Sequence, residues 1–435
     1  MNYEPKTTDP WEGATIDYYS PNETNLLDRW QSLTIWANER AANGLDSFSR
    51  STSSRIGTET RAISRDGRSY QGVNFASQEY LSLANDPRIL KAANEAAERH
   101  GVHSAGSAAL MGLTDLTLDL ERRLADFVKL ADATVFPTGW AAGYGVIRTL
   151  AKENDHIIID VLAHACLQEA ASLTTRNLHR SPHGSTEGIQ RRLERIRKKD
   201  PNAGILVVTE SLFSMDSDVP NIREIQDLCH LHNATLMLDV AHDLGAIGPT
   251  GRGFMEVQGV LGEIDVVMGS FSKSFASNGG FVATNHPALK LALRYMCGPL
   301  TFSNSLSPVQ AAVVLQALDI IDSEEGQGRR RRLMRNVVAL RECLEQAGFE
   351  LLGQPSATVP VLLGGTAVSR EMTSHLLEGG ALVNLVEYPA VSRNACRWRA
   401  QVMADHTTEQ IHRFVELADA SRSYAKQRVS LVLHA

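Results

Sequence analysis

The sequence predicts an α/β fold: a mostly parallel central sheet with helices on both faces, plus a small C-terminal α/β domain. From about residue 75, short apolar runs alternate with amphipathic helical stretches, which is typical of parallel strands joined by crossover helices. The runs expected to be strands are Ala133–Phe136, His156–Ile159, Ile205–Thr209, Thr235–Leu238, Val266–Met268 and Gly280–Thr284. The helical stretches between them include Leu116–Lys129, Gly188–Lys199 and Ile222–His232. Ligands bind beyond the carboxyl ends of such strands, so we expect the functional residues directly after each run.

The length of 435 residues predicts two or three domains, at roughly 100–200 residues for each domain. We expect an N-terminal arm over residues 1–75 with a helix near Asn25–Asn43, the alternative being a partly disordered tail. A large domain is expected over residues 76–307, and a long helix with the small domain over 308–435. The long helical segment covers Pro308–Ala347, and its basic cluster Arg329–Arg332 is interpreted as a solvated helix face.

Composition argues against several classes of function. The net charge of −7 gives no reason to expect nucleic acid or an anionic membrane as a partner. The five cysteines are scattered without a Cys-x-x-Cys pair, which predicts neither a disulfide framework nor a metal site. The first residues do not resemble a signal peptide, and no apolar run approaches the roughly 20 residues of a membrane span. We therefore expect a cytoplasmic protein with reduced thiols.

A lysine follows one expected strand in a serine-rich loop. Lys273 lies in the segment Ser270–Phe275, directly after the run Val266–Met268. A lysine amine can form an imine with an aldehyde cofactor when an electropositive, partly dry pocket favours its neutral form. The hydroxyls of Ser270 and Ser272 can bind a phosphate. The alternative for Lys273, taken alone, is a surface lysine.

A carboxylate ends the expected strand that precedes it in the chain. Asp239 follows Thr235–Leu238, and a buried carboxylate requires a cationic partner. The protonated ring nitrogen of pyridoxal 5'-phosphate (PLP) is such a partner, and its proton lets the ring accept electrons from a carbanion. Ala241 is small enough to pack under the ring, and His242 can hydrogen-bond the ring 3'-oxygen. The alternative for Asp239 is a structural cap of the next turn.

The segment after Ala133–Phe136 predicts a phosphate site. Thr138, Gly139 and Trp140 lie where a strand ends and a helix begins. Free backbone N–H groups and the helix dipole favour an anion at such a helix start, and glycine permits close approach. The alternative is an ordinary strand-to-helix turn.

Polar residues also follow two further runs. His164, after His156–Ile159, can stack over a pyridine ring, although a single histidine is more often structural. Glu210 and Ser214, after Ile205–Thr209, are candidate polar contacts, and Glu210 can equally serve hydrogen bonding within its own loop.

Together these residues resemble the α-oxoamine synthases of PLP fold type I, over residues 74–407. That family includes serine palmitoyltransferase, 8-amino-7-oxononanoate synthase, 2-amino-3-ketobutyrate CoA ligase and 5-aminolevulinate synthase, and the bacterial serine palmitoyltransferase-like branch is the most similar. The segments that carry the resemblance read TESLFSMDSDVPNI, GPTGRGFMEVQG, GSFSKSFASNGGFV and ADHTTEQI.

The resemblance implies PLP as cofactor and a role for each matched position. Lys273 would form the Schiff base, Asp239 would pair with the ring nitrogen, and His164 would stack on the ring. Backbone groups of Gly139 and Trp140 would contact the phosphate. The remaining assignments are Ser270 in place of a usual phosphate-binding Thr, Ser303 and Asn304 in a segment reaching the partner subunit's phosphate, Arg399 for the amino-acid carboxylate, and Gln78 as a candidate substrate contact.

The implied reaction joins an amino acid to an acyl-CoA or acyl-carrier protein, with loss of CO2, in a homodimer with shared active sites. Another fold-type I reaction such as transamination, or a catalytically inactive partner subunit, is the alternative. Retention of Lys273, Asp239 and His164 argues against the inactive subunit. Arg397 faces the same side as Arg399 if this segment is a strand, and its alternative is a surface arginine.

The sequence departs from the family at several positions near where the substrate and the acyl donor enter in the family. The positions that differ are Gln78, Ala108, Leu113, Thr117, Val240 and Asp243, the last where serine is usual. These departures leave cofactor binding intact and leave open which amino acid and which acyl chain are used.

Overall fold

The computed structural model describes residues 9–432. The chain forms two compact units, one of Gln78–Arg332 and one of Met1–Ser77 together with Leu333–Ala435. Each unit contains a sheet of seven strands.

The sheet of the unit Gln78–Arg332 is mostly parallel. Its strands are β4 (Asp132–Phe136), β5 (His156–Asp160), β6 (Asn177–Ser181), β7 (Ile205–Glu210), β8 (Thr235–Asp239), β9 (Val266–Ser270) and β10 (Gly280–Thr284). They are arranged in the order β4-β10-β9-β8-β7-β5-β6, and β10 alone is antiparallel to its neighbours. The six strands predicted from apolar runs are therefore confirmed. β6 was not predicted because its sequence, NLHRS, has no apolar run.

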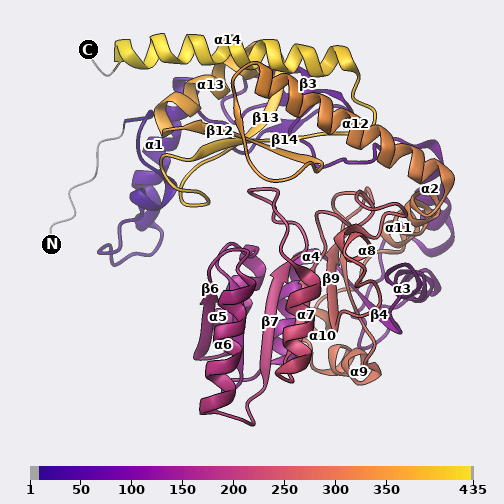
Figure 1. Cartoon of the computed structure of the whole chain (residues 1–435). Helices are drawn as coiled ribbons and strands as arrows, with labels where there is room; N and C mark the ends of the chain where they lie inside the picture. The colour runs from indigo at the N-terminus through magenta and orange to yellow at the C-terminus, as the bar shows by residue number, and fades with distance from the viewer. Residues whose placement is uncertain (1–8, 433–435) are drawn as a thin grey trace. The chain divides into compact units, whose positions relative to one another are not determined.

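Helices pack on both faces of this sheet (Figure 1). The helices of this unit are α2 (Pro87–His100), α3 (Asp115–Val128), α4 (Gly139–Leu150), α5 (Ala165–Thr174), α6 (Thr186–Lys199), α7 (Ile222–Leu231), α8 (Gly253–Val257), α9 (Pro287–Met296), α10 (Gly298–Thr301) and α11 (Pro308–Ile321). On one face, Ile159, Val208, Met237 and Met268 pack with apolar side chains of α4, α5 and α9 in a common core. The other face contacts α6 and α7. The predicted parallel sheet with two helical layers is confirmed.

The second unit has a mixed sheet that brings together distant parts of the chain. Its strands are β1 (Ser51–Thr52), β2 (Glu59–Ile63), β3 (Ser69–Phe75), β11 (Glu350–Leu351), β12 (Thr358–Gly364), β13 (Ala381–Val386) and β14 (Cys396–Gln401). Their order is β1-β2-β3-β13-β14-β12-β11, and the one parallel pair is β3 with β13. Residues 59–75, within the expected N-terminal arm, are thus sheet strands. The helices α13 (Thr366–Glu378) and α14 (Thr408–Val432) pack on each other.

Two helical expectations differ in extent from the structure. The helix expected near Asn25–Asn43 is α1 (Gln31–Ala42), preceded by 3-10 turns at Thr15–Tyr18 and Asp28–Trp30. The single segment expected over Pro308–Ala347 is two helices, α11 and α12 (Glu324–Gln346). The break occurs because the Ser323 hydroxyl accepts the Gly326 N–H (3.3 Å) and so caps a new helix start.

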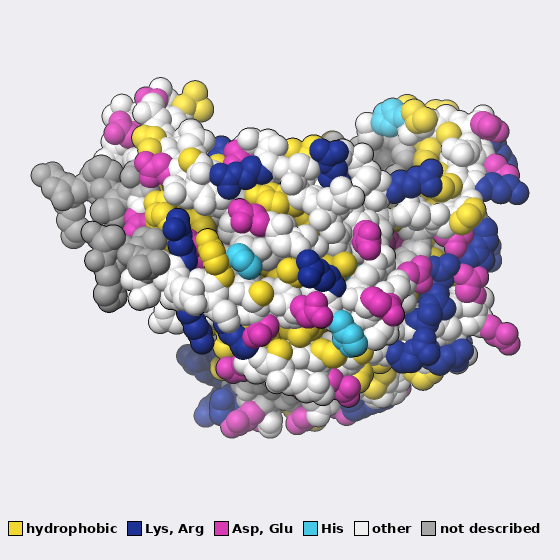
Figure 2. Space-filling model, turned by 90° about the horizontal axis from the view of Figure 1, so that it is seen from above, with side chains coloured by type: hydrophobic (Ala, Val, Ile, Leu, Met, Phe, Trp, Pro, Cys, Tyr) yellow, Lys and Arg dark blue, Asp and Glu magenta, His cyan; other side chains and the backbone are white. Residues whose placement is uncertain are grey.

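Charges of both signs are interspersed on the face of the molecule seen in Figure 2. Among the described residues, no helix is both long and apolar enough to span a bilayer. In the same part of the chain, no cluster of three or more potential metal-ligating side chains occurs.

Candidate active site

Two carboxylates end neighbouring parallel strands. Glu210 is the last residue of β7 and Asp239 the last of β8, and the strand register pairs them directly. Both residues are buried, at 3% and 6% exposure. Burial raises the pKa of each carboxyl group, and the charge of Asp239 raises the pKa of Glu210 further. Such a pair requires positive charge or donated hydrogen bonds to become ionised.

His164 supplies one of those donors. It caps the start of α5, and its backbone N–H donates to Glu210 Oε1 at 2.5 Å. Its ring lies 5.9 Å from the Trp140 ring in an edge-to-face arrangement. Its charge also lowers the pKa of Asp239. His164 is therefore held between the ends of β5 and β7, beside both carboxylates.

Lys273 lies near the same two carboxylates. Its charge lowers the pKa of both Glu210 and Asp239, so the ammonium group is close to the carboxylate pair. The residue is only 8% exposed. The alternative of a surface lysine is therefore wrong, because the loop after β9 turns this side chain inward.

Backbone donors and side-chain hydroxyls lie together where α4 begins. Thr138 Oγ1 accepts the N–H of Ala141 (3.0 Å), and the geometry of a helix start leaves the N–H groups of Gly139 and Trp140 without intrahelical acceptors. A Cβ added at Gly139 would lie 2.6 Å from Ser270 Cβ, so only glycine permits this approach. The Ser270 and Ser272 hydroxyls are 2.8 Å apart. Backbone donors and hydroxyls thus converge, as a phosphate requires.

The Asp239 side chain caps the turn after β8, as its structural alternative implied, and a contact between Tyr80 and His242, which the sequence did not suggest, lies next to it. Asp239 Oδ1 accepts the N–H of Ala241 (2.9 Å), and His242 Nδ1 lies 3.0 Å from the Tyr80 hydroxyl. Tyr80 and His242 are buried. The segment Gln78–Ser82 matches the family at Tyr80 and Leu81. This match was the sequence signal that could have identified Tyr80 as a functional residue.

These features fit PLP in each of its parts. The α4 start and the Ser270 loop fit the phosphate, the Lys273 amine fits the aldehyde, and the buried Asp239 fits the ring nitrogen. A phosphate, an aldehyde and a protonated ring nitrogen therefore each have a matching group at the ends of strands in one sheet.

Comparisons with known proteins agree with this geometry. The family model for aminotransferase class I and II matches residues 70–417. Serine palmitoyltransferase from Sphingomonas paucimobilis is 32% identical over 402 residues, 92% of this chain and 93% of that protein. 8-Amino-7-oxononanoate synthase from Geobacter metallireducens is 36% identical over 350 residues, 80% of this chain and 88% of that protein. A solved structure of serine palmitoyltransferase from S. paucimobilis with a bound PLP–myriocin aldimine has a TM-score of 0.86 at 31% identity, and the match covers 92% of this chain and 99% of that chain.

The chain belongs to the α-oxoamine synthase family. It is thus a PLP-dependent enzyme of fold type I, as the resemblance implied. The sequence therefore predicted the family and the cofactor correctly.

The structure does not place every candidate residue of this α-oxoamine synthase at the pocket. Ser214 is half-buried in the loop after β7. Ser303 donates to the carbonyl of Pro299, and Asn304 pairs with Ser107. Neither contact is to the residues around Lys273.

The candidate substrate residues lie in different units. Gln78 is half-buried in the unit Gln78–Arg332, whereas Arg399 lies on β14 of the other unit. Arg399 and Arg397 are two residues apart on that strand and share a face. Arg397 is only 6% exposed, so its interpretation as a surface arginine is wrong.

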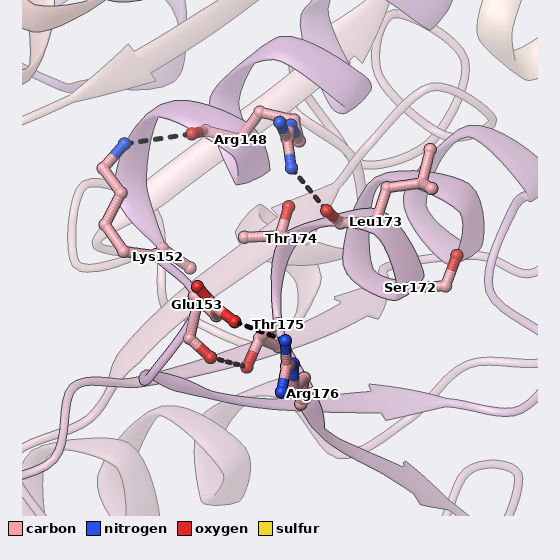
Figure 3. A pocket seen from close by; sticks show the side chains of 9 residues that line it. Arg148, Lys152, Glu153, Ser172, Leu173, Thr174, Thr175 and Arg176 are labelled. Atoms are coloured by element: carbon pink, nitrogen blue, oxygen red, sulfur yellow. Dashed lines mark hydrogen bonds and ion pairs between the residues drawn. The ribbon is translucent and has the colours of Figure 1, made fainter.

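A separate cavity of about 440 Å³ lies at the C-terminal ends of α4 and α5 (Figure 3). Its cations are engaged: Arg148 donates to the carbonyl of Leu173 (2.5 Å), and Lys152 donates to those of Arg148 (3.2 Å) and Thr149 (3.0 Å). These bonds satisfy carbonyl groups that helix ends leave without partners. The residues that line the cavity come directly before β5 and β6 in the chain. The cavity therefore lies at the amino-terminal ends of these strands, whereas Asp239 lies at the carboxyl end of β8.

Proposed function

We propose that this α-oxoamine synthase condenses an amino acid with an acyl thioester and releases an α-amino ketone, the free thiol and CO2. The new C–C bond joins the amino acid's α-carbon to the thioester carbonyl carbon, the C–S bond breaks, and the amino acid's carboxylate leaves as CO2. The donor is an acyl-CoA or an acyl-carrier protein. The observation that carries this proposal is the grouping of Lys273 and His164 around Asp239 in a chain similar to such synthases along most of its length.

Each pocket residue has a distinct task in this proposal. PLP supplies an electron sink that stabilises negative charge at the amino acid's α-carbon. Lys273 would hold the aldehyde of bound PLP, and its free amine would take up the amino acid's α-proton. Asp239 would retain a proton on the ring nitrogen, and His164 would pack against the ring. The hydrogen bond between Tyr80 and His242 fixes the position of the His242 side chain, which would serve the ring oxygen.

Arg399 is the proposed partner of the amino-acid carboxylate. A guanidinium presents a planar fork of donors that can hold a carboxylate with two parallel hydrogen bonds. Holding the carboxylate would also orient the amino acid and so determine which bond at its α-carbon is perpendicular to the PLP ring. Arg397 shares the face of β14 and burial lowers its pKa, so a second acidic group on a substrate would stabilise its charge.

A homodimer is the proposed assembly. The segments around residues 104–107 and 303–305 are joined, because Ser305 N–H donates to the Gly106 carbonyl (2.9 Å) and Ser104 Oγ to the Ser305 carbonyl (3.0 Å). Near this junction the side chains of Leu110, Met111 and Phe302 are 85%, 92% and 90% exposed. Exposed apolar side chains of this size favour a protein interface, and a second copy would then receive Ser303 and Asn304. An enzyme that is monomeric by light scattering yet fully active would contradict this assembly.

The function is tested by incubating the enzyme with single amino acids, with and without an acyl thioester. We expect ketone, CO2 and free thiol only when both substrates are present, detected by mass spectrometry and a thiol reagent. Formation of the corresponding keto acid without thiol would instead show an aminotransferase. The absence of visible cofactor absorbance in the purified protein would favour an inactive partner subunit.

A further inference from the structure

Asp243 is a buried carboxyl group that the proposed reaction does not use. It follows His242 in the turn after β8 and has no exposed surface. Its Oδ2 accepts the N–H of Phe254 at 2.6 Å, and its Oδ1 lies 2.7 Å from Ser211 Oγ. A Cβ added at Gly253 would lie 2.5 Å from Asp243 Oδ2, so the carboxyl group lies directly against the backbone at the start of α8.

Ser211 connects Asp243 to the turn that carries Asp239. The Ser211 hydroxyl lies 3.1 Å from the carbonyl oxygen of Asp239, and the Ser211 N–H donates to the same oxygen at 2.9 Å. The hydroxyl has one proton but faces two oxygens, on Asp239 and on Asp243. If Asp243 were ionised, that proton would be drawn to the carboxylate, and the contact with Asp239 would lack a hydrogen atom.

If the Asp243 carboxyl group is protonated, each of its contacts and the contact between Ser211 and Asp239 contains a hydrogen atom. We propose that Asp243 is a positioning residue that acts in its protonated form, donating to Ser211 Oγ so that Ser211 donates to the Asp239 carbonyl. Its second oxygen accepts the Phe254 N–H. This series of hydrogen bonds joins the ends of β7 and β8 to the start of α8. A serine at position 243, usual in the family, has a single side-chain oxygen and cannot bridge both partners.

The charged neighbours of Asp243 agree with a neutral group. Burial raises its pKa from 3.8 to about 7, with a smaller contribution from the charge of Asp239. On the elements packed around it, Glu210 precedes Ser211, and Lys273 lies in the loop after β9. The charged side chains that flank Gly253–Phe254 bind elsewhere, Arg252 to Asp322 and Glu256 to Thr250. A neutral Asp243 therefore adds no second negative charge next to Asp239.

The test compares three forms of the PLP-loaded enzyme by infrared spectroscopy between pH 5 and 9, with carboxyl-¹³C aspartate to separate Asp from Glu. The wild type should show a protonated-carboxyl band that disappears with a midpoint near pH 7. Asp243→Asn should lack that band, because an amide donates to Ser211 and accepts from Phe254 without titrating. Asp227→Asn makes the same change on an exposed side chain of α7 and should retain it.

Thermal melting gives a second readout that needs no substrate. The folded state holds the proton up to about pH 7, whereas an exposed Asp releases it near 3.8, so the unfolding free energy of the wild type should fall between these values. Asp243→Asn should lack this decline and should melt above the wild type at pH 8. An Asn variant that fails to fold, or that titrates like the wild type, would overturn the proposal. Failure of the condensation assay would leave these results unaffected, so the two proposals are tested separately.

Discussion

The contact between the start of α4 and the loop after β9 gives the sharpest test of the cofactor site. In Gly139→Ala the new methyl would lie 2.6 Å from Ser270 Cβ and 2.7 Å from Ser270 Oγ, well inside van der Waals contact. The obstructing atoms belong to the base of a short side chain, so the loop itself must move. Inserting a methyl into such a space costs about 1–3 kcal/mol.

That cost should appear as lost cofactor affinity, because the loop and the helix start would form the phosphate site together. A penalty of about 1–3 kcal/mol corresponds to an approximately 5- to 150-fold weaker binding constant. The measurement is a titration of PLP into the apoenzyme, followed by absorbance. The protein should remain folded, because the rest of α4 is unchanged.

Two other glycines serve as controls. Gly298→Ala adds a methyl with nothing within 4 Å and should leave both affinity and melting temperature unchanged. In Gly143→Ala, on α4 itself, the methyl would meet Met268 Cε at 2.8 Å and Cys166 Sγ at 2.9 Å, so stability should fall while PLP affinity changes little. Wild-type PLP affinity in Gly139→Ala would refute the phosphate assignment.

Four further predictions concern single side chains. Lys273→Ala should abolish turnover and the visible absorbance of lysine-bound cofactor, and wild-type-like activity would overturn the mechanism. Asp239→Ala should still bind PLP but turn over much more slowly, because the ring nitrogen loses the anion that retains its proton; normal turnover would contradict this role. Arg399→Ala should weaken amino-acid binding by about 1.5–3 kcal/mol, with partial rescue by Arg399→Lys and unchanged PLP affinity; a large loss in Arg397→Ala alone would reverse the assignment. His183, whose pKa is raised from 6.5 to about 10 by hydrogen bonds to Asp160 and Asp218, should stabilise the fold fully below pH 6.5 and lose this effect as pH rises through about 10. His183→Gln should therefore melt with less dependence on pH over this range, and an unchanged dependence would show that another group is responsible.

Local patterns in the sequence were sufficient for the large sheet. Each predicted strand is a short apolar run with a defined end, and parallel strands end at the same edge of a sheet, so the strand ends and Glu210, Asp239 and Lys273 follow from the pattern. β6 was missed because its half-buried residues are polar. The division of the segment Pro308–Ala347 was missed because a single serine cap outweighs continuous helical periodicity.

The tertiary structure alone decided what depends on distant partners. Strands β2 and β3 pair locally, but they join the C-terminal strands because β3 pairs with β13, and no local signal specifies a partner so far along the chain. Tyr80 reaches His242, and Ser211 reaches Asp243, only through the folding of loops that follow different strands. The sequence by itself determined the polar residues after each strand, because these follow from local order, and it determined the family and the cofactor through the resemblance of its motifs. The protonation states of these residues depend on burial and on contacts within about 3 Å, which exist only in the folded chain.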